Sequence, residues 1–229
     1  MIARLKNSRS WVFDLDNTLY PTHSDLFSQV DSKITEYVSK FFDIDLIKAK
    51  ELQKQFYLNS GTTLNGLMEN HSLKEDEYLE FVHDIEYSVL QPDPQLAAAI
   101  DALPGDKHIF TNGSVMHAKN VLNALGFDGL FNGIIDIKAT GYVPKPDQPA
   151  YDHLISDLDL DPNRSVFFED LARNLLPAHQ MGFTTVLVCS DKDWSHEPKG
   201  ARPASINDKY EHVHFSTDDL TGFLKNTAI

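Results

Sequence analysis

The chain has 229 residues, of which 41% are hydrophobic and 24% are charged, a composition typical of a globular protein with one buried core and an inserted or appended subdomain. Its formal net charge of -14 excludes the nonspecific binding of nucleic acid polymers, because that binding depends on Lys and Arg neutralising phosphates. The single cysteine, Cys189, excludes an intramolecular disulfide and a zinc site built from cysteines.

Apolar runs in the sequence are too short to cross a membrane, since none approaches the ~20 residues that span a bilayer. The N-terminal residues do not have the charged and apolar pattern of a secretory leader. We therefore expect neither membrane insertion nor secretion. A cytoplasmic location is predicted, where a lone thiol stays reduced.

Short apolar runs predict the strands of the fold. They are Trp11–Phe13, His108–Phe110, Ile134–Ile137, Val166–Phe168, Thr184–Val188 and Val213–Phe215. Segments with helical spacing separate the later runs, and this alternation is typical of parallel βαβ units. The predicted fold class is α/β, with a Rossmann-like parallel sheet whose ligands bind beyond the carboxyl ends of the strands.

The stretch that follows the first strand contains helical patterns and no convincing strand. One helix is predicted from the apolar residues Leu26, Val30, Ile34, Tyr37, Val38 and Phe41, and Ser72 with Glu75 forms a candidate capping box for another. We expect residues 21–92 to form an all-helical cap subdomain inserted between residues 1–20 and 93–229, which form the α/β core. A plain helical extension is the alternative.

Later helix boundaries are well marked. Asp93 precedes Pro94 and predicts a helix start, Ser114 predicts a second N-cap, and Asp147 predicts a third. Gly126 is placed to end the second of these helices. Residues 192–209 are rich in Pro, Ser, Asp and Lys and predict a surface loop.

Polar and charged residues follow the predicted strands in an ordered series. They are Asp14 and Asp16 after the first, Thr111 to Ser114 after the second, Lys145 downstream of the third, and Glu169 and Asp170 after the fourth. Each alone has an ordinary interpretation as a turn, a helix cap or a solvated lysine. Together they would converge on one crevice and combine carboxylates for a hard cation, hydroxyl and N–H donors for phosphate, and one point charge. This combination predicts metal-assisted phosphoryl transfer.

The segments FDLDNT, TNGS, the lysine of VPKP and FFEDLARN resemble the four ordered motifs of the haloacid dehalogenase-like hydrolase superfamily. They cover the core from residue 10 to about residue 190. WVFDLDNTLYP and the helical stretch FYLNSGTTLNGLM, residues 56–68, resemble the pyrimidine 5'-nucleotidase branch of that superfamily.

The resemblance implies catalytic roles for residues of the core. Asp14 would be the nucleophile that forms an aspartyl-phosphate, and Asp16 the general acid and base. Thr111 would bind a phosphate oxygen through its hydroxyl, and Lys145 would neutralise charge. Asn112 and Gly113 would offer backbone N–H donors to phosphate.

The resemblance also implies a Mg²⁺ cofactor. The ion would be held by the side chain of Asp14, the backbone carbonyl of Asp16 and the side chain of Asp170. Asn174 is expected to support these ligands. Glu169 stands where related sequences often carry Gly or Asp, and its role is left open.

Candidate substrate contacts in the cap are His71 and Thr63. Tyr57 and Thr62 lie in the same stretch and either contact substrate or turn the chain around Gly61. Other histidines, His117, His153 and His179, fall on predicted core helices and are expected to have surface or supporting roles.

The expected function is Mg²⁺-dependent hydrolysis of a small phosphorylated metabolite, with a pyrimidine nucleoside 5'-monophosphate favoured by resemblance. Because Asp16 can protonate a leaving oxygen, and dehalogenating members lack this acid, phosphate esters are favoured over carbon–halogen bonds. A sugar-phosphate or phosphoglycolate phosphatase, or a phosphomutase, would share the core motifs. A noncatalytic phosphate-binding protein is the alternative from another class, and the oligomeric state stays open.

Overall fold

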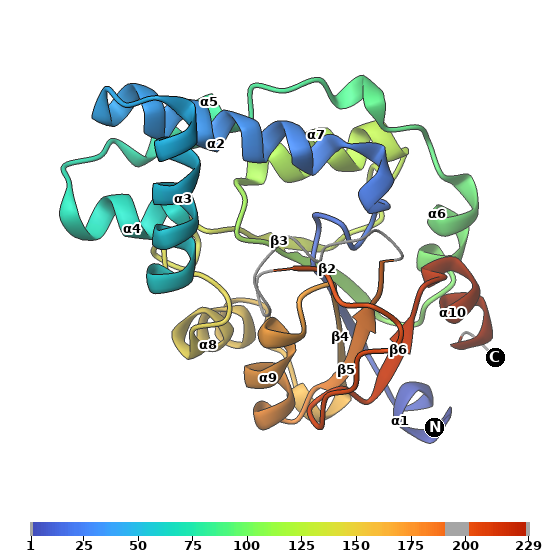
Figure 1. Ribbon diagram of the computed structural model, residues 1–229. Coiled ribbons are helices and arrows are strands. Elements are labelled where there is room, and N and C mark those ends of the chain that lie inside the picture. Colours follow the sequence, from blue (N-terminus) through green and yellow to red (C-terminus); the bar gives the residue numbers. More distant parts are fainter. Residues whose placement is uncertain (1, 191–201, 228–229) are drawn as a thin grey trace.

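A computed structural model describes residues 2–190 and 202–227, which form a parallel sheet covered by helices (Figure 1). The strands are β1 (Ser10–Phe13), β2 (Asp106–Phe110), β3 (Gly133–Ile135), β4 (Ser165–Glu169), β5 (Thr184–Val188) and β6 (Phe215–Thr217). Their order is β3-β2-β1-β4-β5-β6. The predicted α/β fold with a parallel sheet is confirmed. The strand order reverses direction at β1 and β4, and ligands bind at such a reversal in open parallel sheets.

The last strand differs from its prediction. It was expected at residues 213–215, but its ladder with β5 joins Val186 to Phe215 and continues to Val188 and Thr217. Backbone hydrogen bonds define a strand, and they do not require apolar side chains at Ser216 and Thr217. The apolar pattern therefore placed the strand two residues too early.

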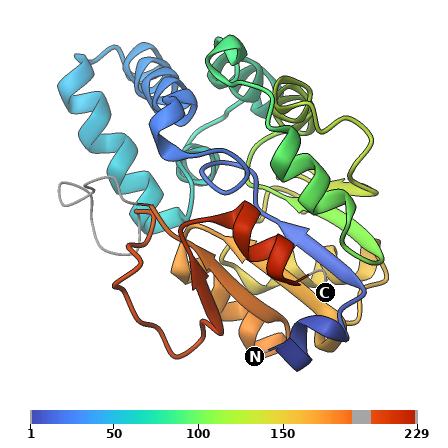
Figure 2. The same cartoon turned by 90° about the vertical axis from the view of Figure 1, so that its right-hand side faces the viewer.

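Side chains alternate between the two faces of the sheet, as a period of two requires. Trp11 and Phe13 of β1 pack into one apolar cluster with helices α6 (Pro94–Asp101), α7 (Val115–Leu125) and α10 (Leu220–Thr227). Val12 packs into the other cluster with α8 (Gln148–Asp157) and α9 (Ala172–Met181). Figure 2 shows α10 lying across one face of the sheet. Leu5 of the N-terminal helix α1 (Ile2–Lys6) joins the first cluster.

A group of helices lies between β1 and α6 in the sequence. Its members are η1 (Thr22–Ser24), α2 (Leu26–Phe42), α3 (Leu46–Ser60), α4 (Thr63–Asn70), α5 (Glu75–Val82) and η2 (Tyr87–Val89). Helices α2, α3, α4 and α5 contribute to a separate apolar cluster that includes Leu67, Tyr78 and Val82. Figure 1 shows α2, α3 and α4 together on one side of the sheet. We call residues 21–92 the helical segment.

Helix starts agree with the sequence in part. Asp93 caps α6 by accepting from the N–H groups of Gln95 and Leu96, and Ser114 caps α7 through the N–H of His117. Asp147 precedes α8 as expected, although its side chain makes no capping bond. The capping box at Ser72 is wrong, because the chain stays extended as far as Lys74 and α5 begins only at Glu75.

The loop expected at residues 192–209 falls largely on residues 191–201, which lie outside the described residues. Residues 202–209 form neither helix nor strand. Within the described chain, no helix combines the length and apolarity needed to cross a membrane.

Candidate active site

The carboxyl ends of β1 and β4 bring three acidic side chains together. Phe13 pairs with Phe168 in the parallel ladder, and the N–H of Asp14 donates to the carbonyl of Phe168 at 2.9 Å. Asp14, which follows β1, is therefore level with Glu169, the last residue of β4, and with Asp170. All three side chains are buried. Adjacent parallel strands thus place the two acidic motifs at one point.

Lys145 is the cation of this cluster. Its Nζ lies 2.6 Å from Oδ1 of Asp14 and 2.9 Å from Oε2 of Glu169, and it donates to the carbonyl of Phe110 at 2.7 Å. Asn112 holds the backbone of Lys145, accepting from its N–H at 2.8 Å and donating to its carbonyl at 3.2 Å. The loop after β2 therefore positions the lysine.

Burial and mutual repulsion set the acidity of the cluster. Burial raises the pKa of Asp14 to about 7, and the neighbouring Glu169 carboxylate is the second cause of this increase. Lys145 has the opposite, smaller effect. The same two causes raise the pKa of Asp170 well above its usual value. Burial alone would lower the pKa of Lys145, but Asp14 and Glu169 outweigh it and raise that pKa. Full ionisation of the three carboxyl groups would therefore leave negative charge that the single ammonium of Lys145 does not offset.

The chemistry of these donors fits a divalent cation. Asp14, Glu169 and Asp170 each offer one carboxylate oxygen, and these oxygens lie within 4.8 Å of one another. Hard cations such as Mg²⁺ take oxygen ligands. Asn174 lines the same cavity, and its buried Oδ1 has no hydrogen-bond partner among the described residues. Glu169, whose role the sequence left open, belongs to this group, whereas the side chain of Asp16 does not.

Asp16 has its own set of partners. Its Oδ1 accepts from the hydroxyl of Tyr20 at 2.5 Å and lies 2.8 Å from Nε2 of His117. Burial favours the neutral acid, but His117 and Tyr20 together bring the pKa of Asp16 below its usual value. The two carboxyl groups of the Asp-x-Asp motif therefore sit in different environments, one on a lysine and one on a histidine.

The loop after β2 is organised by Thr111. Its Oγ1 accepts from the N–H of Gly113 at 2.9 Å, so that this N–H is committed within the loop. The N–H of Asn112 has no hydrogen bond among the described residues. Of the two backbone donors expected for phosphate, Asn112 is thus the one available in this structure. The hydroxyl hydrogen of Thr111 is also available to a ligand.

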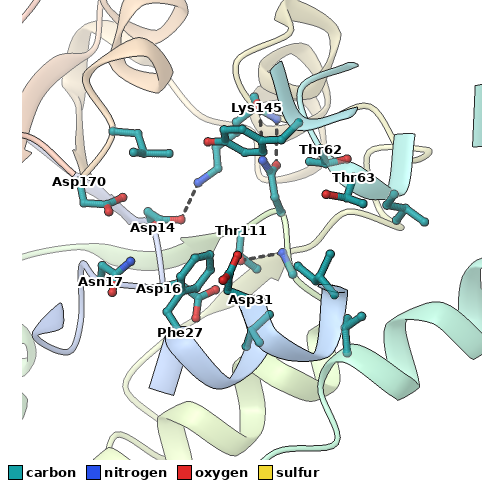
Figure 3. A pocket seen from close by; sticks show the side chains of 18 of the residues that line it. Asp14, Asp16, Asn17, Phe27, Asp31, Thr62, Thr63, Thr111, Lys145 and Asp170 are labelled. Atoms are coloured by element: carbon teal, nitrogen blue, oxygen red, sulfur yellow. Dashed lines mark hydrogen bonds and ion pairs between the residues drawn. The ribbon is translucent and has the colours of Figure 1, made fainter. Parts of the chain in front are cut away.

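These groups open into one cavity of about 420 Å³, within the size range of small-ligand pockets. Figure 3 shows Asp14, Asp16, Thr111, Lys145 and Asp170 around it. The helical segment supplies the opposite wall. The lining residues from this segment include Phe27, Asp31, Ile34, Lys50, Gln53, Tyr57, Leu58, Thr63 and His83.

The wall formed by the helical segment carries a polar network. Asp31 of α2 accepts from Nε2 of Gln53 at 2.8 Å and pairs with Lys50, both on α3. Gln53 is buried and its Oε1 accepts from Thr35 at 2.5 Å. The polar side chains of Asp31, Lys50 and Gln53 therefore line the cavity next to the apolar side chains of Phe27 and Ile34.

A contact between aromatic and cationic side chains joins the two walls. The guanidinium of Arg173, at the start of α9, lies 4.4 Å from the ring centre of Tyr57 on α3, a cation–π arrangement. Burial raises the pKa of the Tyr57 hydroxyl to about 12. Both residues line the cavity.

The candidate substrate contacts from the helical segment differ in position: Thr62 and Thr63 line the cavity, and His71 does not. Thr63 is buried, lines the cavity and begins α4, while Thr62 lines it and caps the same helix. His71 is not among the residues that line the cavity. Its ring packs edge-on against Phe41 and Phe42 at the end of α4. The expected substrate contact of His71 is not supported, because helix α4 carries it away from the strand ends.

Some residues at the site had no assigned role in the sequence. His83, Asp31 and Arg173 reach the cavity only because separate helices pack against one another. The sequence contains no local signal for this packing. His117 did carry one, since it lies three residues after the N-cap Ser114, in the first turn of a helix that starts at the site. That position directs its side chain to Asp16, a contact that fits the expected supporting role.

Two curated proteins are similar in sequence to parts of this chain. Enolase-phosphatase E1 of Frankia alni is 36% identical over 83 residues, 35% of this chain and 34% of that protein. Phosphate metabolism protein 8 of Saccharomyces cerevisiae is 26% identical over 194 residues, 76% of this chain and 60% of that protein. The chain thus spans less than two thirds of either curated relative.

A solved structure and a family match complete the comparison. A HAD phosphatase from Thermococcus onnurineus matches with a TM-score of 0.60 and 17% identity, covering 95% of this chain and 97% of that one. The haloacid dehalogenase-like hydrolase family matches residues 11–182. The chain belongs to this family of hydrolases.

Proposed function

We propose that this haloacid dehalogenase-like hydrolase is a Mg²⁺-dependent phosphomonoesterase that acts through an aspartyl-phosphate on Asp14. One observation carries the proposal: Asp14 and Asp16 face one cavity but have different partners, Lys145 for the first and His117 with Tyr20 for the second. Two carboxyl groups in different environments suit two different roles.

The proposed reaction has two steps. An oxygen of Asp14 attacks phosphorus while the bond from phosphorus to the leaving oxygen breaks, and Asp16 gives its proton to that oxygen. Asp16 then takes a proton from water, whose oxygen attacks phosphorus and releases phosphate and the Asp14 carboxylate. Thr111 and the N–H of Asn112 would hold phosphate oxygens, and Lys145 would offset their charge.

The proposed metal ligands are Asp14, Asp170 and the backbone carbonyl of Asp16, with Glu169 close enough to join them. Mg²⁺ would supply positive charge that neutralises the phosphate and the carboxylates. Asp14 and Lys145 hold each other in place at 2.6 Å, so that the nucleophile is oriented by the chain itself.

We also propose that residues 21–92 act as the cap and that residues 1–20 and 93–229 form the core. The cavity supports this division, because its catalytic wall comes from strand ends and its opposite wall from α2, α3 and α4. A cap of this kind excludes water and selects the leaving group.

The proposed substrate is a nucleoside 5'-monophosphate, with pyrimidine nucleotides favoured by the resemblance of residues 56–68 to that branch. Apolar walls at Phe27 and Ile34, together with the Asp31 and Gln53 network, suit a planar base with a hydrogen-bonding edge. A cytoplasmic location is part of the proposal, since a reducing compartment keeps the buried Cys189 as a thiol.

Phosphate release from a panel of monoesters tests the proposal. The protein is treated with a chelator, then assayed with and without Mg²⁺ on UMP, CMP, ribose 5-phosphate, phosphoglycolate and p-nitrophenyl phosphate. We expect Mg²⁺-dependent turnover with kcat/KM highest for UMP or CMP. Comparable turnover of ribose 5-phosphate with negligible turnover of UMP and CMP would reject the nucleotide assignment.

The matched variant is Asp14→Asn, which keeps the size of the side chain and removes the nucleophile. We expect it to lose turnover of every substrate while keeping its circular dichroism spectrum. An active Asp14→Asn would reject the covalent mechanism, and an inactive wild type that still binds phosphate would favour the noncatalytic alternative.

A further inference from the structure

The carboxyl group of Asp16 is anchored at one oxygen only. Tyr20 donates to Oδ1 at 2.5 Å, and Nε2 of His117 lies 2.8 Å from the same atom. Oδ2 makes no hydrogen bond within the described parts of the chain, although Asp16 lines the cavity. Two partners on one oxygen restrict rotation of the carboxyl group, so that Oδ2 is the oxygen left for a ligand.

His117 is itself held in a single orientation. Its side chain is fully buried, and the hydroxyl of Tyr87 lies 3.0 Å from its Nδ1. The same hydroxyl donates to the backbone carbonyl of His83 at 3.1 Å. The Tyr87 hydroxyl thus contacts both His83 and the His117 ring, which ties the ring to the chain on the side of Nδ1. This arrangement directs Nε2 toward Asp16.

A second residue of the helical segment covers the ring of His117. His83 stacks on it with ring centres 4.4 Å apart and an angle of 14° between the planes. Nδ1 of His83 lies 3.1 Å from Oγ of Ser114, which caps α7. Burial and His117 lower the pKa of His83 to about 3. The stacked pair joins the end of α5 to the first turn of α7.

The space around the pair is tight. A Cβ placed on Gly113 would lie 3.2 Å from Cδ2 of His117 and 3.7 Å from Nε2 of His83. Both rings are therefore close to the loop that carries Thr111. They are part of the same compact unit as the residues proposed to hold phosphate.

We propose that His117 is a positioning residue for the general acid, and that His83 and Tyr87 of the proposed cap hold it in place. His117 fixes Oδ1 of Asp16 so that Oδ2 is directed to the leaving oxygen. The proposed cap therefore has two roles: it helps to orient the carboxyl group of Asp16, and it forms part of the leaving-group pocket. This inference rests on the proposed function, in which Asp16 protonates the leaving group.

Leaving-group dependence separates positioning from ordinary packing. Phenyl phosphate and p-nitrophenyl phosphate have similar shapes, but the nitrophenolate leaves with little help from an acid. The measurement is kcat/KM for both esters with Mg²⁺, because this ratio includes the step in which the leaving group departs.

We expect His117→Asn to lower kcat/KM for phenyl phosphate at least about tenfold more than for p-nitrophenyl phosphate, since general acid help contributes roughly 10²- to 10⁴-fold. His117→Gln, whose amide can donate to Oδ1, should recover part of the loss. Tyr87→Phe removes the hydroxyl that orients the ring and should also lower kcat/KM more for phenyl phosphate than for p-nitrophenyl phosphate. It tests the inference independently if His117→Asn fails to fold. His153→Asn, at an exposed position of α8, is the matched control and should leave the ratio of kcat/KM for the two esters unchanged.

If His117→Asn and Tyr87→Phe lower kcat/KM equally for both esters, the inference is overturned, and His83 and His117 serve only to pack the helices together. Asp16→Asn, assayed alongside, tells this failure from failure of the proposed function. If Asp16→Asn shows the larger loss for phenyl phosphate and the His117 and Tyr87 variants do not, only the inference fails. If Asp16→Asn shows no such difference, the proposed acid is wrong and the inference falls with it.

Discussion

The ammonium of Lys145 lies 2.6 Å from Oδ1 of Asp14, although 131 residues separate them along the chain. Both side chains are buried, and the same ammonium also contacts Glu169. Breaking a buried ion pair on one side is costly, because it leaves the partner's charge uncompensated. Lys145 is thus tied to both the orientation of Asp14 and the charge balance of the site.

Replacing Lys145 with Met should lower kcat by about 10²- to 10³-fold or more, as loss of a preorganised charge does. Lys145→Arg should be similarly impaired, because a guanidinium cannot reproduce three contacts between 2.6 and 2.9 Å made by one nitrogen. Steady-state assays on p-nitrophenyl phosphate measure both. Lys119→Met, at an exposed position of α7, is the control. A Lys145→Met variant with more than a tenth of wild-type kcat contradicts the assigned role.

Mg²⁺ should stabilise the chelator-treated protein against heat. At a concentration about 100 times its Kd, an ion bound only by the folded state adds about 2.7 kcal/mol, or on the order of 5–10 °C in Tm. Asp170→Asn should lose most of this shift, because it removes the negative charge of one carboxylate in the proposed ligand group. Asp31→Asn, which changes a carboxylate elsewhere in the cavity, should retain the shift. Equal shifts in both variants would place the ion elsewhere.

The network on the opposite wall should control which ester is hydrolysed. Asp31→Asn breaks the ion pair with Lys50 and leaves the proposed catalytic residues unchanged. We expect kcat/KM for UMP to fall about tenfold, the equivalent of one or two lost hydrogen bonds, while p-nitrophenyl phosphate changes less than about twofold. Glu51→Gln, at an exposed position of α3, serves as control. A uniform loss with every ester would make the network structural and not selective.

Gly66 marks a close approach of α4 to α3. A Cβ there would lie 2.4 to 2.6 Å from three atoms of Phe56, among them its Cβ, which cannot move aside without the backbone. Gly66→Ala should lower the free energy of unfolding by about 1–3 kcal/mol, measured by urea titration. It should also raise KM, since α4 carries Thr63 at the cavity. Glu80→Ala, exposed on α5, is the comparison, and an unchanged midpoint for Gly66→Ala would refute the close contact.

The core of the site could be predicted because it depends on short-range rules. Asp14, Thr111 and Glu169 each end or follow a buried strand, and parallel strands end at one edge of the sheet. The apolar runs located those strands to within about two residues, the largest error falling at the last of them. Position in the sequence was therefore enough to place these residues together.

The helical segment was less predictable. Its α2 pattern agrees with the structure, but the capping box before α5 is wrong. Helical periodicity shows which face of a helix is apolar, and it does not show how far that helix lies from the strand ends. His71 does not line the cavity, whereas Asp31 and His83 line it although no motif marks them in the sequence.

The sequence by itself determined the α/β sheet, the ordered acidic, hydroxyl and basic motifs and the position of the two carboxyl groups after the first strand, because hydrophobic periodicity and strand-end position are local properties of the chain. Only the tertiary structure decided which groups surround each carboxyl group. Lys145 and Glu169 meet at Asp14, while His117 and Tyr20 meet at Asp16. These meetings depend on the packing of helices and loops far apart in sequence, and packing is a property of the whole fold.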